Sequence, residues 1–423
     1  MSTVTAAVVA GELRITGTDL SDVITVGPAP VGGAQVTVGG AVVAVFTAAV
    51  DRVRVDAGAG DDSVLLEPGL AIPAVLFGGA GSDTLVGGGG ADRLYGGAGN
   101  NVLAGAGGDD VLVSLGGGTA DTLTGGGGRD SFWLDAGKRE RVTDAAGDEA
   151  LLGTHRVKGF GLRPRGSIAA QLAVTDLPDP ATTADATGGY ASFADRPLFA
   201  DTGPTIGDVV QGQLGDCYFL SVLAAAADVQ PQRVRDAVVD LGDGTYAVQF
   251  ARGKTKTYHR VDADLPTDAW GRPAYAQLGA GGSLWVAVLE KAFTGFRTAS
   301  YTYASIECGW MTEPAAALGM SYKSLDAATG GGGLLQLVGD AHDAGRATAL
   351  ATRAALDGEK FVSGHAYTVA GVNRGSGGAV VSLMLRNPWG TDGYTTLDAA
   401  DDGLVDVDAG ELAAMFGAVL IAA

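Results

Sequence analysis

The chain has 423 residues, of which 46% are hydrophobic, and it carries a formal net charge of -20 at pH 7. This length allows two or three domains, while the acidity leaves no basic patch to neutralise phosphates, which excludes nucleic acid as an expected partner. Two cysteines are too few for a disulfide framework, and no apolar run reaches the ~18 residues of a membrane span.

Residues 1–56 alternate apolar and polar side chains in GELRITGTDLSDVITVGPAP, VTVGGAVVAVF and RVRV, a pattern that predicts β-strands. We expect these strands to cap the segment that follows, because an open strand edge invites aggregation. The first residues, MSTVTAAVVAGELRITG, contain no basic region, so the sequence predicts no secretory signal peptide.

Glycine totals 69 residues, more than twice the ~7% of an average protein, and most of the excess lies in residues 57–130. The predicted repeat domain spans residues 57–137. Residues 78–113 divide into the nine-residue blocks GGAGSDTLV, GGGGADRLY, GGAGNNVLA and GAGGDDVLV. Related blocks are AGAGDDSVL at 57–65, GGGTADTLT at 116–124 and GGGGRDSFW at 125–133. A flexible glycine-rich linker would not keep an acidic residue two positions before a large apolar one, so we predict a repeat structure.

These blocks resemble the RTX (repeats-in-toxin) parallel β-roll, whose nonapeptides bind calcium. The resemblance implies an all-β N-terminal roll with an apolar row pointing inward. Turn carbonyls and the aspartate at position six would supply the oxygens that Ca²⁺ prefers. Asn101 replaces the aspartate of one block, which should weaken that site. The candidate calcium ligands are Asp62, Asp83, Asp92, Asp110, Asp121 and Asp130.

Residues 138–191 are predicted to be a transitional segment that ends in a linker, since TDLPDPATTADATGGY has few large apolar side chains. A second domain is then expected over residues 192–423. Its first notable motif is QGQLGDCYFL, in which Cys217 follows a Gly-Asp turn and opens an apolar run that predicts a helix. Asp216 is the predicted N-cap of this helix.

A thiol nucleophile needs a base and a group that orients the base. His365 lies in GHAYTVAGV and Asn387 in LRNPWG, both after Cys217 in the chain. The order is that of a Cys-His-Asn triad. Taken alone, each residue would more often be structural, but three motifs in this order favour catalysis. Cys308 is interpreted as a packing residue, and His155, His259 and His342 as surface or structural residues.

With SLWVAVLEKAF (283–293) and VDADLPTD (261–268), these motifs resemble the catalytic core of the calpain family of cysteine proteases. The resemblance implies an α+β papain-like fold of two subdomains. It assigns Cys217 as nucleophile, His365 as base and then acid, and Asn387 as its orienter. Gln211 would donate to the oxyanion together with the Cys217 backbone N–H, and Trp389 would shield the His-Asn hydrogen bond.

The sequence also departs from the family. Tyr218 stands where tryptophan is common, which keeps an aromatic ring. Asp208 matches a carboxylate that binds calcium in calcium-regulated members, but Ala304 and Leu404 stand where its acidic partners are expected. The resemblance therefore implies calcium in the repeats and leaves calcium in the protease core in doubt.

Of three functions considered from the sequence, the motifs favour the first, and the intact Cys-His-Asn order argues against the second. The first is an endopeptidase that hydrolyses extended protein segments through a thioester and is joined to a calcium-binding roll. The second is an inactive calpain-like module that acts in adhesion or as a scaffold. The third is an acyl transferase of the transglutaminase type, against which Asn387 argues because aspartate is typical there. The repeats favour a secreted or cell-surface bacterial protein, since weak sites need extracellular calcium. The sequence does not indicate the oligomeric state.

Overall fold

A computed structural model describes residues 3–118, 120–147, 149–161, 166–298, 300–328, 333–356, 360–393 and 401–423. It divides into two compact units, one of Met1–Phe160 with Pro164–Val174 and one of Gly161–Arg163 with Thr175–Ala423. The domain limits at residues 56, 137 and 191 that we expected from the sequence stay predictions.

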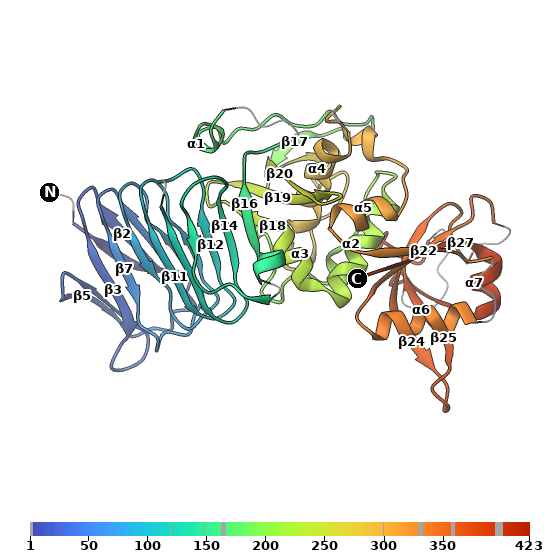
Figure 1. Ribbon diagram of the computed structural model, residues 1–423, viewed down its shortest axis with the longest axis horizontal. Helices are drawn as coiled ribbons and strands as arrows, with labels where there is room; N and C mark the ends of the chain where they lie inside the picture. The colour runs from blue at the N-terminus through green and yellow to red at the C-terminus, as the bar shows by residue number, and fades with distance from the viewer. Residues whose placement is uncertain are drawn as a thin grey trace. The chain divides into compact units, whose positions relative to one another are not determined.

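The first unit is a β-solenoid in which the chain alternates between two sheets (Figure 1). Among the described residues, one sheet contains, in spatial order, β1 (Thr5–Val9), β2 (Glu12–Thr18), β6 (Arg52–Gly58), β8 (Ala74–Phe77), β10 (Arg93–Tyr95), β12 (Val111–Ser114), β14 (Ser131–Asp135) and β16 (Thr154–Val157). The other contains β15 (Arg141–Val142), β13 (Thr122–Gly127), β11 (Val102–Gly107), β9 (Thr84–Val86), β7 (Ser63–Leu66), β3 (Val23–Pro28), β4 (Ala34–Val38) and β5 (Ala41–Phe46).

Neighbouring strands of the solenoid pair in parallel from β2 to β16 and from β3 to β15, and β1, β4 and β5 pair antiparallel at one end. The predicted parallel roll is therefore confirmed. Parallel pairing begins before residue 57, because Ile15 aligns with Val55 and Ile24 with Val64 in the same inward row. The interior contains the apolar residue of each repeat: Val64, Leu85, Leu94, Leu103, Leu112, Leu123 and Phe132 are at most 1% exposed.

The second unit mixes helices with antiparallel sheets, as the predicted α+β fold requires. Its described helices are α2 (Cys217–Val229), α3 (Pro231–Ala237), α4 (Trp285–Arg297), α5 (Thr312–Ala317), α6 (Leu334–Asp343) and α7 (Ala409–Met415), and α1 (Ile168–Leu172) belongs to the first unit. Short helical turns are η1 (Glu149–Gly153) in the first unit, and η2 (Ile206–Asp208), η3 (Ala280–Gly282) and η4 (Tyr303–Ile306) in the second. None of the helices in the described ranges is long and apolar enough to cross a membrane.

The described strands of the second unit form three sheets. A small sheet pairs β17 (Gly189–Ser192) with β21 (Asp264–Thr267), and a second contains β18 (Val238–Asp240), β19 (Thr245–Arg252) and β20 (Thr255–Asp262). The largest contains, in spatial order, β22 (Tyr322–Asp326), β27 (Phe416–Ala422), β23 (Ala347–Thr352), β24 (Ala366–Arg374), β25 (Val380–Arg386) and β26 (Leu404–Val407).

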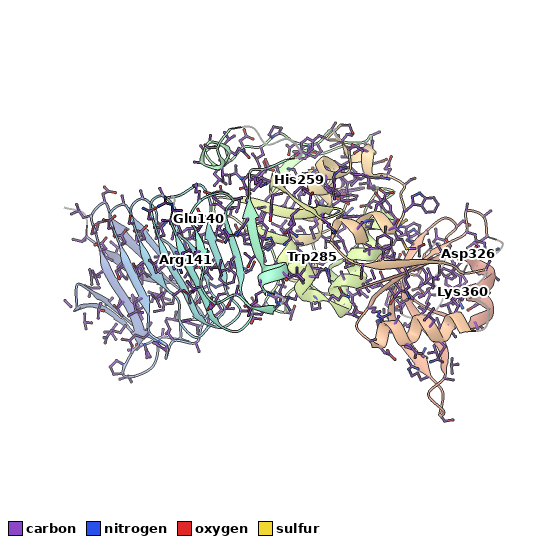
Figure 2. All side chains as sticks on the ribbon, in the orientation of Figure 1. Glu140, Arg141, His259, Trp285, Asp326 and Lys360 are labelled. Carbon is purple, nitrogen blue, oxygen red and sulfur yellow. The ribbon has the colours of Figure 1, made fainter. Side chains whose placement is uncertain are left out.

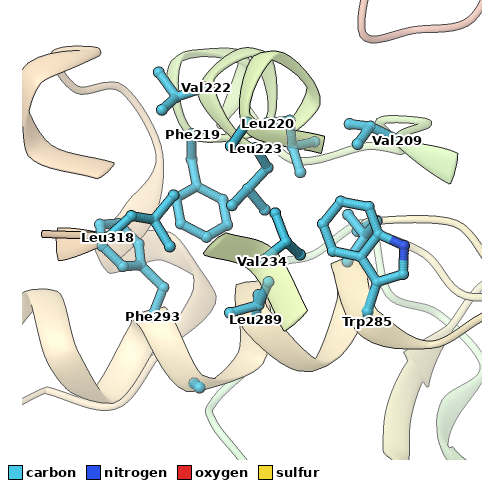
Figure 3. Close-up of a cluster of buried hydrophobic side chains, with 14 of the residues drawn as sticks. Val209, Phe219, Leu220, Val222, Leu223, Val234, Trp285, Leu289, Phe293 and Leu318 are labelled. Carbon is cyan, nitrogen blue, oxygen red and sulfur yellow. The ribbon is translucent and has the colours of Figure 1, made fainter. Parts of the chain in front are cut away.

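The packing of α2 against α4 forms the helical core of this unit (Figure 3). The ring centroids of Phe219 and Phe293 lie 4.4 Å apart, and Leu220 and Leu289 fill the same core. Trp285, at the start of α4, is fully buried here (Figures 2 and 3). Because α2 is buried almost all round, its apolar run YFLSVLAAAA becomes a central helix that holds its first residue in place.

The largest sheet packs a separate apolar cluster under α6 and α7. The Thr368 hydroxyl in β24 donates to the Ser221 carbonyl in α2 over 2.7 Å. The first turn of α2, which begins at Cys217, therefore lies beside the start of β24, which His365 directly precedes.

Candidate functional sites

Cys217 is the first residue of α2 and is partly buried. Its thiol accepts a hydrogen bond from the backbone N–H of Ala366, the residue that follows His365. The first N–H groups of a helix have no partner within that helix, and their dipoles favour a negative charge nearby. This position therefore suits a thiolate.

His365 is buried and precedes β24. Its backbone is fixed on both sides by Thr352, whose hydroxyl accepts from the His365 N–H over 2.8 Å and whose N–H donates to the His365 carbonyl over 2.8 Å. The imidazole Nε2 lies 2.8 Å from Oδ1 of Asn387. Since an amide oxygen only accepts, Nε2 carries the proton, and Nδ1 keeps its lone pair.

Asn387 follows β25 and is fully buried. Its Oδ1 also accepts from the backbone N–H of Trp389 over 3.0 Å, and the Trp389 ring lies 4.8 Å from the His365 ring. These contacts fix the amide and cover the imidazole. The structure thus places Asn387 against the His365 imidazole and the Cys217 thiol against the residue that follows His365. The catalytic triad of these three residues stays a prediction.

Burial disfavours a negative charge on the Cys217 thiol and a positive charge on the His365 imidazole when either forms alone. It raises the pKa of the Cys217 thiol to about 11 and lowers the pKa of His365 to about 4. Each group on its own is therefore neutral near pH 7.

Gln211 lies beside this group through its backbone, whose N–H donates to the carbonyl of Pro388 over 2.7 Å. Its side-chain Nε2 donates to the Leu214 carbonyl over 2.6 Å, which leaves the second amide hydrogen for another acceptor. The side chain is buried and fixed close to the turn that leads to Cys217. This position is compatible with the oxyanion role that the sequence predicts.

We expect Gln211→Ala to lower kcat by roughly 10²–10³ with little change in KM, because an oxyanion donor acts in the transition state. Steady-state kinetics on a fluorogenic peptide measures both constants. Gln213→Ala is the matched control, since Gln213 is exposed two residues away. A change in KM alone would rule out the oxyanion role.

Asp208, the match to a calcium-binding carboxylate, has no free oxygen to offer. It is fully buried, and four groups donate to its two oxygens: the N–H groups of Thr205 and Ala280, the Ser283 hydroxyl and Trp285 Nε1. Ala304, in η4, and Leu404, in β26, supply no carboxylate. Asp208 therefore acts as a structural acceptor in this fold.

The packing role that we expected for Cys308 is wrong. Its thiol is exposed, and its backbone has a φ of 49°, in the left-handed region. The neighbours Ile306 and Met311 turn inward instead, which leaves Cys308 on the outer side of the turn. His155 and His259 are buried among aromatic rings, and His342 faces Asp228 at 3.9 Å.

The predicted calcium ligands form two ladders along the roll. In the first ladder, each backbone N–H donates to Oδ1 of the next side chain along the roll: Asp22 to Asp62, Asp62 to Asp83 and Asp83 to Asn101, each over 2.7–2.8 Å. The backbone N–H of Asn101 donates in turn to Oδ1 of Asp121. The second ladder has the same pattern: the backbone N–H of Ala74 donates to Oδ1 of Asp92, that of Asp92 to Asp110 and that of Asp110 to Asp130, over 2.7–3.0 Å.

The second carboxylate oxygens of Asp62, Asp83 and Asp110 are buried without a hydrogen-bond partner in the described part of the chain. At Gly78, a Cβ would lie 2.5 Å from Oδ2 of Asp83 and 2.6 Å from the Gly96 carbonyl, so this space is framed by oxygens. Gly87 and Gly105 have the same surroundings. Burial raises the pKa of Asp110 to about 8, so its charge lacks compensation.

This donor set fits Ca²⁺, which prefers carboxylate and carbonyl oxygens. The described residues contain no group of three His, Cys, Asp or Glu side chains that could hold a metal. The further oxygens near Asp83, Asp92 and Asp110 are the carbonyls of Gly96, Gly105 and Gly125. At Gly96, the Asn101 amide nitrogen takes the place of the second oxygen, which supports the predicted weakening there.

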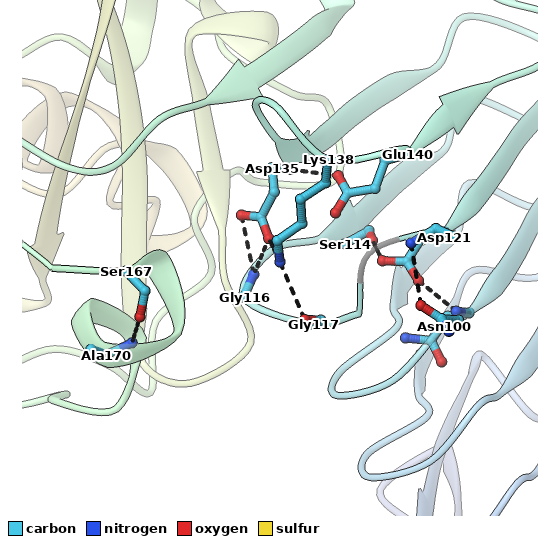
Figure 4. Close-up of polar contacts among 12 residues, drawn as sticks. Asn100, Ser114, Gly116, Gly117, Asp121, Asp135, Lys138, Glu140, Ser167 and Ala170 are labelled. Carbon is cyan, nitrogen blue, oxygen red and sulfur yellow. Dashed lines mark hydrogen bonds and ion pairs between the residues drawn. The ribbon is translucent and has the colours of Figure 1, made fainter.

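Sequence reasoning missed the ends of both ladders. Glu140, which Figure 2 labels beside Arg141, aligns with Asp121 through the pairing of Arg141 with Thr122. Glu149 accepts a hydrogen bond from the Asp130 N–H over 3.2 Å. At the same end, the Lys138 ammonium contacts the Asp135 carboxylate and the Gly117 carbonyl (Figure 4). The sequence signal for this end of the ladder was Glu140, an acidic residue two positions before the apolar Val142, but the glycines of the repeat do not precede it.

A Cys-His-Asn group on an α+β fold defines a site of the cysteine-peptidase class. Comparison with known proteins identifies the family: residues 190–399 match the calpain family of cysteine proteases, and residues 77–112 and 115–138 match the RTX calcium-binding nonapeptide repeat. The chain therefore contains a calpain-family protease domain joined to RTX repeats, and RTX repeats bind Ca²⁺.

Curated relatives agree with this assignment. The chain is 27% identical over 200 residues to the calpain-type cysteine protease DEK1 of Zea mays, which covers 44% of this chain and 9% of the relative. It is 28% identical over 221 residues to the calpain-2 catalytic subunit of Bos taurus, which covers 48% of this chain and 31% of the relative. The chain thus spans at most about a third of these relatives.

Proposed function

We propose that the second unit is a cysteine endopeptidase that uses Cys217, His365, Asn387 and Gln211. The observation that carries this proposal is the buried hydrogen bond of 2.8 Å between His365 Nε2 and Asn387 Oδ1, with the Cys217 thiol beside the same segment. This bond leaves Nδ1 as the basic nitrogen of His365. An adhesion module would need no such orientation of an imidazole.

In the proposed reaction, His365 takes the thiol proton and the Cys217 sulfur attacks the peptide carbonyl. The Cys217 N–H and the free amide hydrogen of Gln211 stabilise the oxyanion. His365 then gives the proton to the leaving amine, and a thioester remains. Water, deprotonated by His365, hydrolyses the thioester and restores the thiol.

The proposed substrate is an extended segment of protein, as the protease names of the relatives suggest. The acyl-transferase alternative is disfavoured because the third residue is Asn387, and nothing in the fold favours the inactive module. Since RTX repeats are typical of secreted bacterial proteins, we propose a secreted or cell-surface location.

An epoxide inhibitor of thiol proteases tests this proposal in the full chain. We expect rapid alkylation at Cys217 and slow alkylation at Cys308, because only the former has an adjacent base. Peptide mass spectrometry reads both sites in one sample, so the exposed Cys308 is an internal control. Equal rates at the two thiols would contradict an activated nucleophile.

We also propose that the six aspartates of the ladders bind calcium with turn carbonyls. Asp110→Asn should remove or weaken one calcium ion, since its unpaired Oδ2 is lost as an anionic ligand. Titration calorimetry of the full chain counts the ions. Asp109→Asn is the matched control, because Asp109 is exposed and adjacent. Identical stoichiometry and affinity in both variants would exclude Asp110 as a ligand.

A further inference from the structure

Asp216, which immediately precedes the proposed nucleophile, does not act as the predicted N-cap. It occupies the cap position of α2, but its side chain makes no capping hydrogen bond. It is fully buried, and both of its carboxylate oxygens lack a conventional hydrogen-bond partner among the described residues. An ionised carboxylate in this position would be costly, so the side chain needs a compensating partner.

That partner is Glu290 in α4, which is 2% exposed. The backbone N–H of Ala276 donates to both Glu290 oxygens, over 3.1 and 3.2 Å, and the Glu290 side chain hydrogen-bonds to that of Asp216. Carboxylate oxygens only accept, so a hydrogen bond between the two groups requires a proton on one of them. Burial and the neighbouring charge raise the pKa of Glu290 well above its usual range.

In the described part of the chain, no cation acts directly on either carboxyl of the pair. Arg297 lies 5.2 Å from the centre of the Tyr218 ring and acts on Tyr218. Several side chains interact electrostatically with these two carboxyls. Those in the described part of the chain include Cys217, Tyr218, Tyr275, Tyr303 and Glu307. All of these are neutral or acidic. The Tyr303 hydroxyl is also buried and has no hydrogen-bond partner among the described residues, so it donates to neither carboxyl. A proton is therefore the simplest source of compensation.

The pair also connects the two halves of the proposed oxyanion site. Glu290 holds Ala276, and the flanking residues of that segment hydrogen-bond to the segment of Gln211: the Gln213 N–H donates to the Ala274 carbonyl and the Gln277 N–H to the Val210 carbonyl, each over 2.9 Å. Asp216 is bonded directly to Cys217. One shared proton thus ties the start of α2 to the segment that carries Gln211.

We propose that Asp216 and Glu290 share one proton at neutral pH and are positioning residues that hold the Cys217 and Gln211 donors in register. The effect of this pair on catalysis rests on the proposed peptidase function, whereas the shared proton itself does not. The sign of its pH dependence follows from the raised pKa of Glu290. The shared proton stabilises the folded protein fully below the ordinary carboxyl pKa of about 4. This stabilisation is lost as the pH rises through the raised pKa of Glu290 in the folded protein, because two buried negative charges then repel.

The first test is infrared difference spectroscopy of the calcium-saturated full chain at pH 7. Subtracting the spectrum of Glu290→Gln from that of the wild type should reveal a carboxylic acid C=O band, which Glu307→Gln, an exposed control, should retain. Absence of the band from the difference spectrum, or a metal ion that is bound by the wild type and lost in Glu290→Gln, would overturn the proposal. This readout does not depend on activity.

The second test is kinetics from pH 6 to 9. Glu290→Gln should keep kcat within about threefold at pH 6, because its amide donates to Asp216 at every pH, and its activity should fall less at alkaline pH. Glu290→Leu should lower kcat by about 10–100-fold with KM nearly unchanged, since small displacements of reacting groups have such effects. An unchanged kcat in Glu290→Leu would refute positioning. Inactivity of the wild type would refute the peptidase proposal instead, and leave the infrared result standing.

Discussion

Cys217→Ala will abolish peptide hydrolysis, with a loss of about 10⁴-fold or more in kcat, because no thioester can form without the sulfur. His365→Ala should be nearly as severe, since the thiol pKa of about 11 leaves little thiolate without a base. Asn387→Ala should be milder, because the Trp389 ring still packs against the imidazole. Steady-state rates on a peptide library measure all three.

The matched control is Cys308→Ala, which removes the other thiol of the chain and should keep wild-type rates. Circular dichroism must show that Cys217→Ala is folded, which we expect because its partly buried side chain is small. Wild-type turnover in Cys217→Ala would refute the nucleophile. Equal losses in the two cysteine variants would point to a shared structural effect instead.

The sequence was informative where one local pattern specifies both structure and chemistry. In the roll, Asp83 and Leu85 repeat at fixed spacing, so the ladder and the apolar row could both be predicted. In the protease domain, the segments around Cys217, His365 and Asn387 each carry several matching residues. Their order along the chain was enough to anticipate that α2 and β24 would bring them together.

The features that the sequence did not predict depend on contacts between residues far apart in the chain, which no local pattern encodes. The pairing of Asp216 with Glu290 follows from the packing of α2 against α4, and a sequence window around Asp216 shows only a plausible helix cap. Glu140 lies at the end of a ladder without the glycines that mark the other rungs. Cys308 was predicted to pack in the core because IECGWM resembles no catalytic motif, but its thiol is exposed and its backbone is left-handed.

Removal of calcium from the full chain should unfold the roll and spare the protease domain. The roll has a thin apolar row, and ordering its many glycines costs conformational entropy. Without a cation, the buried Oδ2 atoms of Asp62, Asp83 and Asp110 add unfavourable charge. The protease domain instead has two extended apolar clusters, and its Asp208 is saturated by donors of the chain.

Hydrogen exchange followed by mass spectrometry can measure both units in one sample. In a chelator, we expect residues 57–133 to lose protection and to regain it on addition of calcium, whereas α2 and α4 stay protected in both conditions. Peptide hydrolysis in the same samples should change less than about twofold, because the proposed catalytic residues and the candidate calcium ligands belong to different compact units. A protease that stays inactive until calcium arrives would contradict this, and would mean that Asp208 exchanges its hydrogen bonds for a metal ion.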